Sequence, residues 1–207
     1  MEPEATKENH PLRNYYRFWR VSNIDANTDN YENALEDLGL CRTVEQFWEI
    51  YCFLPVIGTG SCDSYYFFKD GIMPLWEDPE NKNGGRVTLT LTGTELLPYL
   101  WETLLLTTIG EQFNVGKEIC GVSVTVKPKK NQSVLCVWNK TATFGRVITQ
   151  IETVLKTVWN SPPRMRFAYK RNSNAVYSVS MKKEDQEPEA TEIKTENRFA
   201  GFEDFHV

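Results

Sequence analysis

Histidine and long apolar runs are the two features that the sequence has least of. Of its 207 residues only His10 and His206 are histidine, which argues against a histidine-based zinc site and against a histidine-dependent catalytic triad. No apolar run approaches the ~18 residues that cross a bilayer, so we expect no transmembrane helix. The first nine residues are polar and contain no apolar segment of the kind found in secretory signals, so we expect no secretion.

Paired cysteine motifs and an excess of positive charge are missing as well. The five cysteines include no Cys-x-x-Cys spacing, which favours reduced and mostly buried thiols in a cytoplasmic protein, with the nucleus as a further location. The formal net charge is −5, so the molecule as a whole does not attract nucleic acid. Any site for an anion must therefore be a local basic patch.

Arrangements typical of catalysis are also not found. Glu77 and Asp78 are adjacent carboxylates, but no second carboxylate is placed to face them across a glycosidic bond. The chain has no Gly-x4-Gly-Lys-Ser/Thr phosphate loop, and its serine and cysteine residues have no histidine base. We therefore expect no enzyme activity, no metal site and no cofactor.

The composition fits one domain of ordinary size. With 41% apolar and 25% charged residues, the chain can bury a single substantial core. We expect a folded domain over residues 10–181. A flexible lead at 1–9 would precede it, and a flexible, charge-rich tail at 182–207 would follow it.

Short alternating segments and three helical periodicities indicate the architecture. Alternation predicts strands at 14–21, 65–69, 86–92, 122–126, 133–138 and 165–169, with one more near 175–180. The 3.6-residue period predicts helices beginning at Thr43, at 98–109 and at 147–159. Residues 22–40 and 71–85 are expected to be loops. The pattern predicts an α+β fold, with three helices packed on one face of a curved, mostly antiparallel sheet.

The second of these loops holds an unusual pair, Trp76 and Glu77. A loop Trp beside a carboxylate suits a flat cationic ligand, because the ring supplies stacking and cation–π attraction while the acid accepts hydrogen bonds from the ligand edge. Tyr31, in the other long loop, would supply a second ring. The alternative is that Trp76 packs against the core, as a Trp near a Pro usually does.

A basic cluster stands out in this acidic protein. Lys127, Lys129 and Lys130 follow one another with no acid between them, and Arg86 is a further candidate cation. The cluster is either a phosphate site or the solvated tip of a hairpin.

An apolar helix face also has two interpretations. Val44 and Trp48 fall on one face of the first helix, and Leu104 and Leu105 lie on the second. Together they form either an apolar groove for a partner helix or part of the core.

Four motifs resemble those of one known family. They are His10-Pro11-Leu12, Thr43–Trp48 (TVEQFW), Phe68–Asp78 (FKDGIMPLWED) and Asn81–Arg86 (NKNGGR). Their order and spacing are similar to those of the cap-binding translation initiation factor 4E family, over His10 to Tyr169. Within that family the chain resembles the 4E-homologous class, since Tyr31 and Tyr16 stand where the founding factor has Trp.

The resemblance implies a cupped sheet, with the helices on its convex face, that binds the 7-methylguanosine cap of mRNA. Tyr31 and Trp76 would stack on the methylated base, and Glu77 would accept hydrogen bonds from the guanine edge. The other implied contacts are Trp138 to the N7-methyl group, and Arg86, Lys127, Lys129 or Lys130 to the phosphates.

On the convex face the resemblance implies a second surface, which grips a helical Tyr-x4-Leu-apolar motif of 4E-binding proteins. Glu102 would face a basic residue of that peptide. The chain departs from the family at Trp101, which usually is Leu, and at Val87, which usually is Trp. The implied partner-binding residues are His10, Pro11, Val44, Trp48, Glu102, Leu104 and Leu105.

These features imply a monomeric, non-catalytic protein that regulates translation through its partners, by repression or by transcript-selective control. Two alternatives stay open. One is a productive initiation factor that recruits the 4G scaffold, and the other is an adaptor that no longer binds the cap.

Overall fold

The computed structural model describes residues 9–21, 34–59, 64–162 and 165–173. In this part of the chain seven strands form one sheet in the order β2-β1-β3-β5-β6-β4-β7, and every neighbouring pair is antiparallel. The strands are β1 (Pro11–Val21), β2 (Leu35–Thr43), β3 (Ser64–Lys69), β4 (Gly85–Thr92), β5 (Ile119–Lys127), β6 (Gln132–Asn139) and β7 (Phe167–Arg171). The helices are α1 (Val44–Tyr51), α2 (Pro79–Lys82), α3 (Leu97–Ile109) and α4 (Gly145–Val158), with a 3₁₀ turn, η2, at Pro128–Lys130.

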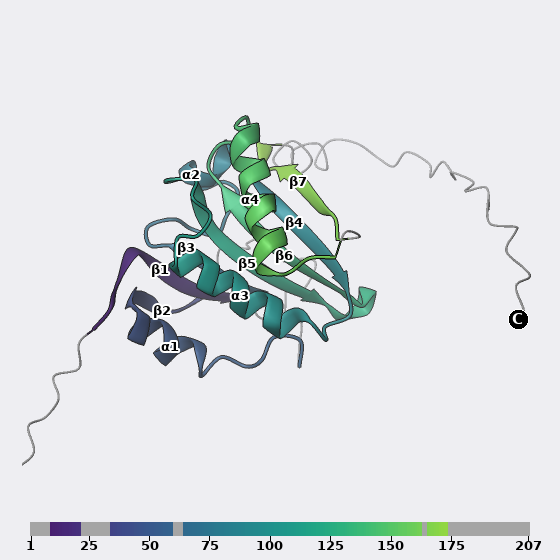
Figure 1. The fold of residues 1–207 in the computed structure, drawn as a ribbon. Helices are drawn as coiled ribbons and strands as arrows, with labels where there is room; N and C mark the ends of the chain where they lie inside the picture. The colour runs from purple at the N-terminus through teal and green to yellow at the C-terminus, as the bar shows by residue number, and fades with distance from the viewer. Residues whose placement is uncertain (1–8, 22–33, 60–63, 163–164, 174–207) are drawn as a thin grey trace, which may run out of the picture.

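Three helices cover one face of the curved sheet. Figure 1 shows α1, α3 and α4 together on the same side, while the short α2 lies at the end of the sheet. The packing is continuous, since α3 contacts β1, β5 and α4, and α4 contacts β4. The predicted α+β fold is therefore confirmed.

Strand alternation creates a core on each face of the sheet. In β3, Tyr65 and Phe67 belong to the main core beneath the helices. Tyr66 and Phe68 belong to a smaller apolar cluster on the opposite face, which also contains Ile72 and Trp138. Because successive side chains of a strand point to opposite faces, the central strand is buried on both sides.

Several expected boundaries differ from the observed ones. Residues 35–40 were expected in a loop but lie in β2, an edge strand whose polar residues and positive-φ Gly39 (φ +132°) hide the usual alternation. The predicted loop at 71–85 also contains the four-residue α2, which Asp78 caps. Thr43 caps α1 as predicted, since its Oγ1 accepts a hydrogen bond from Gln46 N at 3.2 Å. The strand expected near 175–180 and the tail lie outside the described residues.

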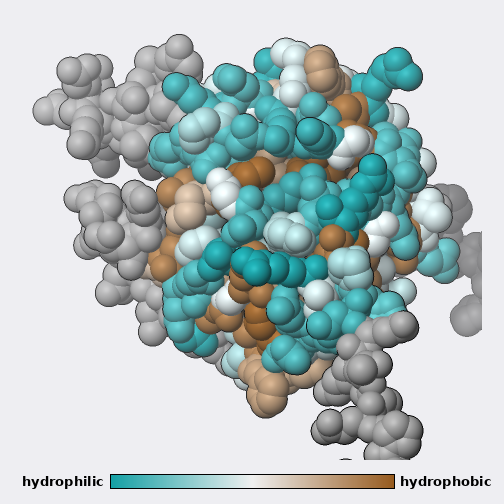
Figure 2. Space-filling model, turned by 90° about the vertical axis from the view of Figure 1, so that its left-hand side faces the viewer, coloured by the Kyte–Doolittle hydropathy of each residue, from teal (hydrophilic) through white to brown (hydrophobic). Residues whose placement is uncertain are grey.

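Polar and apolar side chains are mixed over the end of the molecule where β1 begins. Figure 2 views this end, the left-hand side of Figure 1, and shows apolar residues in patches recessed between hydrophilic ones. No helix in the described ranges has the length and apolarity needed to cross a membrane. The four cysteines that fall within them are free thiols.

Gly121 in β5 allows this strand to approach β3 closely. A Cβ atom at this position would lie 2.5 Å from Phe68 Cγ and 2.7 Å from the Phe67 carbonyl oxygen. We expect Gly121→Ala to lower the free energy of unfolding by about 1–3 kcal/mol, because an overpacked core must shift. Urea unfolding measures this change.

Gly145→Ala is the matched control, since a Cβ atom there meets nothing within 4 Å and Ala favours the first turn of α4. It should leave stability unchanged or slightly higher. Equal destabilisation by the two variants would contradict the proposed steric cause.

Candidate functional site

The segment that carries Trp76 and Glu77 joins β3 to α2 and is fixed by a capping carboxylate. Asp78 Oδ1 accepts a hydrogen bond from Glu80 N at 2.8 Å, which caps α2. Its other oxygen accepts one from Met73 N at 2.9 Å. A single side chain therefore ties the beginning of the Trp76 segment to the beginning of the helix that follows it.

A buried amide holds the same segment from beneath. Asn81 is fully buried, and its Nδ2 donates to the carbonyl oxygens of Met73 and Leu75, both at 2.8 Å. The Asn81 carbonyl in turn accepts a hydrogen bond from Nδ2 of the buried Asn172 at 2.8 Å. This network orders the backbone on both sides of Trp76, which is partly exposed, and of Glu77, which is exposed.

The Glu77 carboxylate has no partner among the described residues. No hydrogen bond or ion pair within the described ranges involves it, in contrast to Asp78 next to it. An exposed acid on an ordered backbone is available to accept hydrogen bonds from a ligand.

Trp138 in β6 lies on the face of the sheet that the helices leave uncovered. It is only 5% exposed, and its Nε1 donates to Ser123 Oγ at 3.0 Å. The Phe68 ring packs edge-on against it, with centroids 5.4 Å apart. Ile72, from the Trp76 segment, belongs to the same apolar cluster, so that segment and Trp138 meet on one face.

Arg86 in β4 lies beside Trp138 on the face of the sheet that the helices leave uncovered. It pairs across strands with Trp138, and its guanidinium carbon lies 4.6 Å from the Trp138 ring centroid. The Arg86 Nε is buried and has no hydrogen-bond partner in the described part of the chain. A buried donor without an acceptor is costly, so an anionic group beside Trp138 would be stabilised here.

The hairpin lysines lie farther away. Lys127 ends β5, Lys129 and Lys130 form η2, and all three are exposed. Lys127 pairs with Gln132, at the opposite end of β6 from Trp138. At ~3.3 Å per residue this places the hairpin tip about 20 Å along the strand from Trp138. The structure thus brings Arg86, but not the three lysines, next to the ring.

Tyr31, the other predicted stacking residue, lies outside the described residues. Val87, where the resemblance anticipates Trp, is buried in the main core on the opposite side of β4 from Arg86.

A second candidate surface lies on the helix-covered side, where β1 begins beside α1. His10 is joined to Glu45 by two contacts, from its backbone N to Oε2 at 3.0 Å and between its Nδ1 and Oε1 at 2.7 Å. Hydrogen bonding by His10 lowers the pKa of Glu45 to about 2. Pro11 is exposed and Val44 is partly exposed.

Trp48 borders a hollow between α1 and α3. Its side chain remains 37% exposed and packs edge-on against Phe47 and Tyr51, with centroids 5.1 and 5.7 Å away. The hollow has a volume of about 500 Å³, and its lining includes Trp48, Tyr51, Tyr99, Trp101 and Glu102. Burial, reinforced by the Glu102 carboxylate, raises the pKa of Tyr51.

Leu104 and Leu105 do not take part in this surface. Both are fully buried in the main core, because α3 is apolar around most of its circumference and packs against the sheet and α4. Their periodicity fitted a groove or a core, and the structure places them in the core. The lining of the hollow beside Trp48 instead includes Glu102 and one edge of Trp101, which is itself only 2% exposed.

The side chains that position the candidate residues could not be recognised from the sequence. Asn81 and Ser123 touch the carbonyls and the indole that hold the candidate residues in place. Neither is marked by a spacing pattern, because each acts through a contact made only in the folded chain. Asn81 lies in a turn-rich stretch where an Asn is ordinary.

Comparison with known sequences identifies a family. The family described as Eukaryotic initiation factor 4E matches residues 11–187. Translation initiation factor 4E-4 of Caenorhabditis elegans is 32% identical over 177 residues, which cover 84% of this chain and 82% of that protein. Translation initiation factor NCBP of Oryza sativa subsp. japonica is 31% identical over 163 residues, which cover 78% and 70%.

Solved structures agree with this result. C. elegans eIF4E-3, in a complex with the 4E-binding protein Mextli and a cap analog, superimposes with a TM-score of 0.76 at 33% identity, covering 82% of this chain and 96% of that one. Ascaris suum eIF4E-3 with an m2,2,7G cap gives a TM-score of 0.74 at 29% identity, covering 79% and 92%.

The anchoring of the Trp76 segment can be tested by removing the Asn81 amide. We expect Asn81→Ala to lower the free energy of unfolding by about 1–3 kcal/mol, since two partly buried carbonyls lose their donor. Hydrogen exchange of the amides at 73–78 should also become faster.

Asn83→Ala is the control, because Asn83 is exposed and contributes its backbone carbonyl rather than its side chain to the fold, accepting from Ala142 N at 3.0 Å. Unchanged exchange at 73–78 in Asn81→Ala would show that the segment is ordered by other contacts.

Proposed function

Because this chain belongs to the eukaryotic initiation factor 4E family, we propose that it binds the 7-methylguanosine 5′ cap of mRNA on the sheet face opposite the helices. The observation that carries the proposal is the ordered Trp76–Glu77 segment, with its unoccupied carboxylate, on the same face as Trp138. Related eIF4E-3 proteins have been solved with a cap analog and with methylated caps.

Base recognition follows from the properties of the methylated purine. Methylation at N7 gives the base a delocalised positive charge, which strengthens stacking on the π-faces of Trp76 and Tyr31. The Glu77 carboxylate accepts hydrogen bonds from the guanine edge, and these are charge-assisted. Trp138, held by Ser123 and Phe68, offers an ordered apolar edge to the methyl group.

Phosphate recognition is divided between two places. Arg86 lies against Trp138 and has a buried donor to satisfy, so it contacts the phosphates nearest the base. Lys127, Lys129 and Lys130 at the exposed hairpin tip contact the chain farther on. Each of these contacts binds and orients, and none breaks a bond, in keeping with a family of translation factors rather than enzymes.

The helix-covered face takes a 4E-binding protein through a helical Tyr-x4-Leu-apolar motif. His10, Pro11, Val44, Trp48 and Glu102 form this surface, and the hollow beside Trp48 accepts the apolar end of the motif. The eIF4E-3 structure with Mextli supports a 4E-binding protein as the class of partner. Trp101, in the wall of the hollow, gives it a bulkier border than the usual Leu.

Two tyrosines favour the 4E-homologous class. In this proposal the protein acts as a monomer in the cytoplasm and regulates translation. Tyr31 replaces a sandwich Trp. Tyr16 replaces another Trp and is buried, stacked on Phe67 with its hydroxyl donating to Glu111 at 2.7 Å. A productive factor that recruits the 4G scaffold is the second candidate, because the Trp48 surface serves either kind of partner.

Glu77 tests cap binding directly. We expect Glu77→Gln to weaken binding of 7-methylguanosine nucleotide by roughly 10- to 100-fold, since the amide keeps the shape but loses the charged acceptor. Fluorescence titration measures the affinity, with mono- and trimethylated cap analogues and GTP as competitors. Glu95→Gln, at an exposed acid just before α3, should bind like the wild type.

The same titration tests the second ring. Tyr31→Trp should bind the cap more tightly by roughly 1 kcal/mol, because indole has the larger π-face, whereas Trp76→Ala should not be retained on immobilised cap. Wild-type affinity in both Glu77→Gln and Trp76→Ala would show that the cap is bound at another site. Failure of the unmodified protein to be retained on immobilised cap would leave the adaptor interpretation.

Trp48 tests the partner surface. Trp48→Ala should weaken binding of a Tyr-x4-Leu-apolar peptide by at least ~2 kcal/mol, the usual cost at a central aromatic contact, with cap affinity unchanged. Phe53→Ala is the control, since Phe53 is 87% exposed and does not line the hollow. Pull-down with scaffold or repressor peptides distinguishes the productive role from the regulatory one. Undiminished peptide binding by Trp48→Ala would refute the proposed partner surface.

A further inference from the structure

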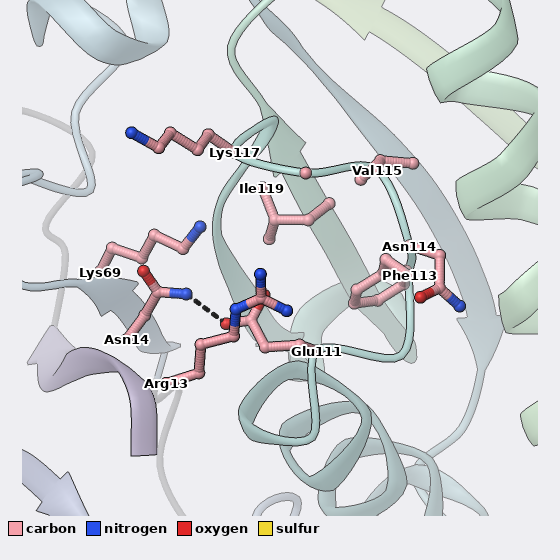
Figure 3. Close-up of a pocket in the computed structure, with 10 residues that line it drawn as sticks. Arg13, Asn14, Lys69, Glu111, Phe113, Asn114, Val115, Lys117 and Ile119 are labelled. Atoms are coloured by element: carbon pink, nitrogen blue, oxygen red, sulfur yellow. Dashed lines mark hydrogen bonds between the residues drawn. The ribbon is translucent and has the colours of Figure 1, made fainter. Parts of the chain in front are cut away.

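A basic pocket lies at the end of the sheet where β1 and β5 begin and β3 ends. It has a volume of about 370 Å³ and is bordered by the segment at 111–117. Figure 3 shows Arg13 and Lys69 extending into one space from β1 and β3, with Lys117 on the bordering segment and Glu111 beside them. The residues that line the pocket therefore include three cations and one carboxylate.

Lys69 is the most buried of these three cations. Its side chain is partly buried, and no hydrogen bond or ion pair to it is found in the described ranges. Burial lowers the pKa of Lys69, an effect that Glu111 opposes and that the positive charges of Lys140 and Lys117 reinforce. Lys140 is itself paired with Glu80. An anion bound here would offset the cost of burying the Lys69 charge and the repulsion between Lys69 and the neighbouring lysines.

Glu111 does not neutralise the pocket. Its Oε1 accepts hydrogen bonds from Asn14 Nδ2 at 2.6 Å and from the Tyr16 hydroxyl at 2.7 Å, and Figure 3 shows the first of these. Neither Arg13 nor Lys69 nor Lys117 forms an ion pair with it. The carboxylate is thus held by neutral donors, and the pocket retains an excess of two positive charges.

The pocket is separate from the proposed cap site but close to the partner surface. Lys69 is on the same side of β3 as Tyr65 and Phe67, the helix-covered side, whereas the cluster around Trp138 is on the other. Arg13 follows Pro11 by two residues on β1, or about 7 Å along the strand. A peptide that passes His10 and Pro11 needs only a few extended residues to reach the pocket.

We propose that this pocket binds a phosphorylated serine or threonine of a partner protein, next to the helical segment that lies on the Trp48 surface. The inference rests on the proposed partner surface and adds a phosphate-dependent contact to it. A phosphate monoester carries a charge of about −1.5 to −2 at pH 7 and three acceptor oxygens, which match two uncompensated cations better than a single carboxylate does.

The first arm of the test needs no partner. O-phosphoserine amide is titrated against the full chain at constant ionic strength, and the Lys69 side-chain NMR signals are followed. We expect saturable shifts that unmodified serine amide does not produce. They should be lost in Lys69→Met and reduced in the exposed Lys117→Gln, but kept in Lys156→Met, which removes a distant cation on α4.

The second arm uses a Tyr-x4-Leu-apolar peptide with one flanking serine, placed at successive distances on either side of the motif. At the best distance, phosphorylation should tighten binding roughly five- to tenfold, and Lys69→Met should remove this gain while leaving the affinity of the unmodified peptide unchanged. The Trp48→Ala variant should weaken both peptides.

The outcomes separate the two proposals. Unmodified peptide that binds with no gain on phosphorylation at any distance overturns the pocket and leaves the partner surface intact. Failure of the unmodified peptide to bind overturns the partner surface, and the phosphopeptide proposal with it. Lys69-dependent shifts produced by an uncapped RNA oligonucleotide, and not by phosphoserine, would show that the class of ligand is wrong.

Discussion

The two-sided burial of the central strands is the constraint on which the rest of the structure depends. In β3 successive aromatic side chains alternate between the core under the helices and the small cluster on the open face. A sheet of this kind commits one face to helix packing and leaves the other as an ordered platform. Gly121 permits the close fit at Phe68, which in turn supports the edge of Trp138. Trp138, one of the proposed cap contacts, is thus placed by the same contacts that hold the sheet together.

Those parts of the fold that follow from local pattern could be predicted from the sequence. The alternation in β4 and in the β5–β6 hairpin, and the helical period of α4, each identify an element without reference to the rest of the chain. β2 was missed because Cys41 is its one buried residue, so its sequence shows no clean alternation. The short α2 was missed because its Pro and Asn residues equally suit a loop. Leu104 and Leu105 suited a groove or a core, since periodicity cannot say what covers a helix face.

The residues of the candidate site likewise fall into two groups, those that a local sequence pattern marks and those whose role depends on the folded chain. The Trp76–Glu77 pair was predicted because an aromatic beside a charge is visible in one dimension, whereas Arg86 was predicted from a basic cluster and Trp48 from a helix face. The motifs that contain them resemble those of the family to which the chain belongs. The amide of Asn81 and the hydroxyl of Ser123 could not be found, because they act on groups that only folding brings near. Lys69 gave no signal either, since its lack of an acid partner is a property of the three-dimensional charge arrangement.

In the proposed mode of cap binding, the length of the β5–β6 hairpin determines how contacts to the base and contacts to the phosphates respond to salt. Trp138, the proposed contact to the methylated base, lies at one end of β6, while Lys127, Lys129 and Lys130, the proposed contacts to the phosphates farther along, lie at the other. Contacts between lysine and phosphate release counterions and weaken steeply as salt rises, whereas ring stacking hardly responds. High ionic strength would therefore weaken the proposed contacts to the phosphates of the mRNA, while the proposed contacts to its methylated base would persist.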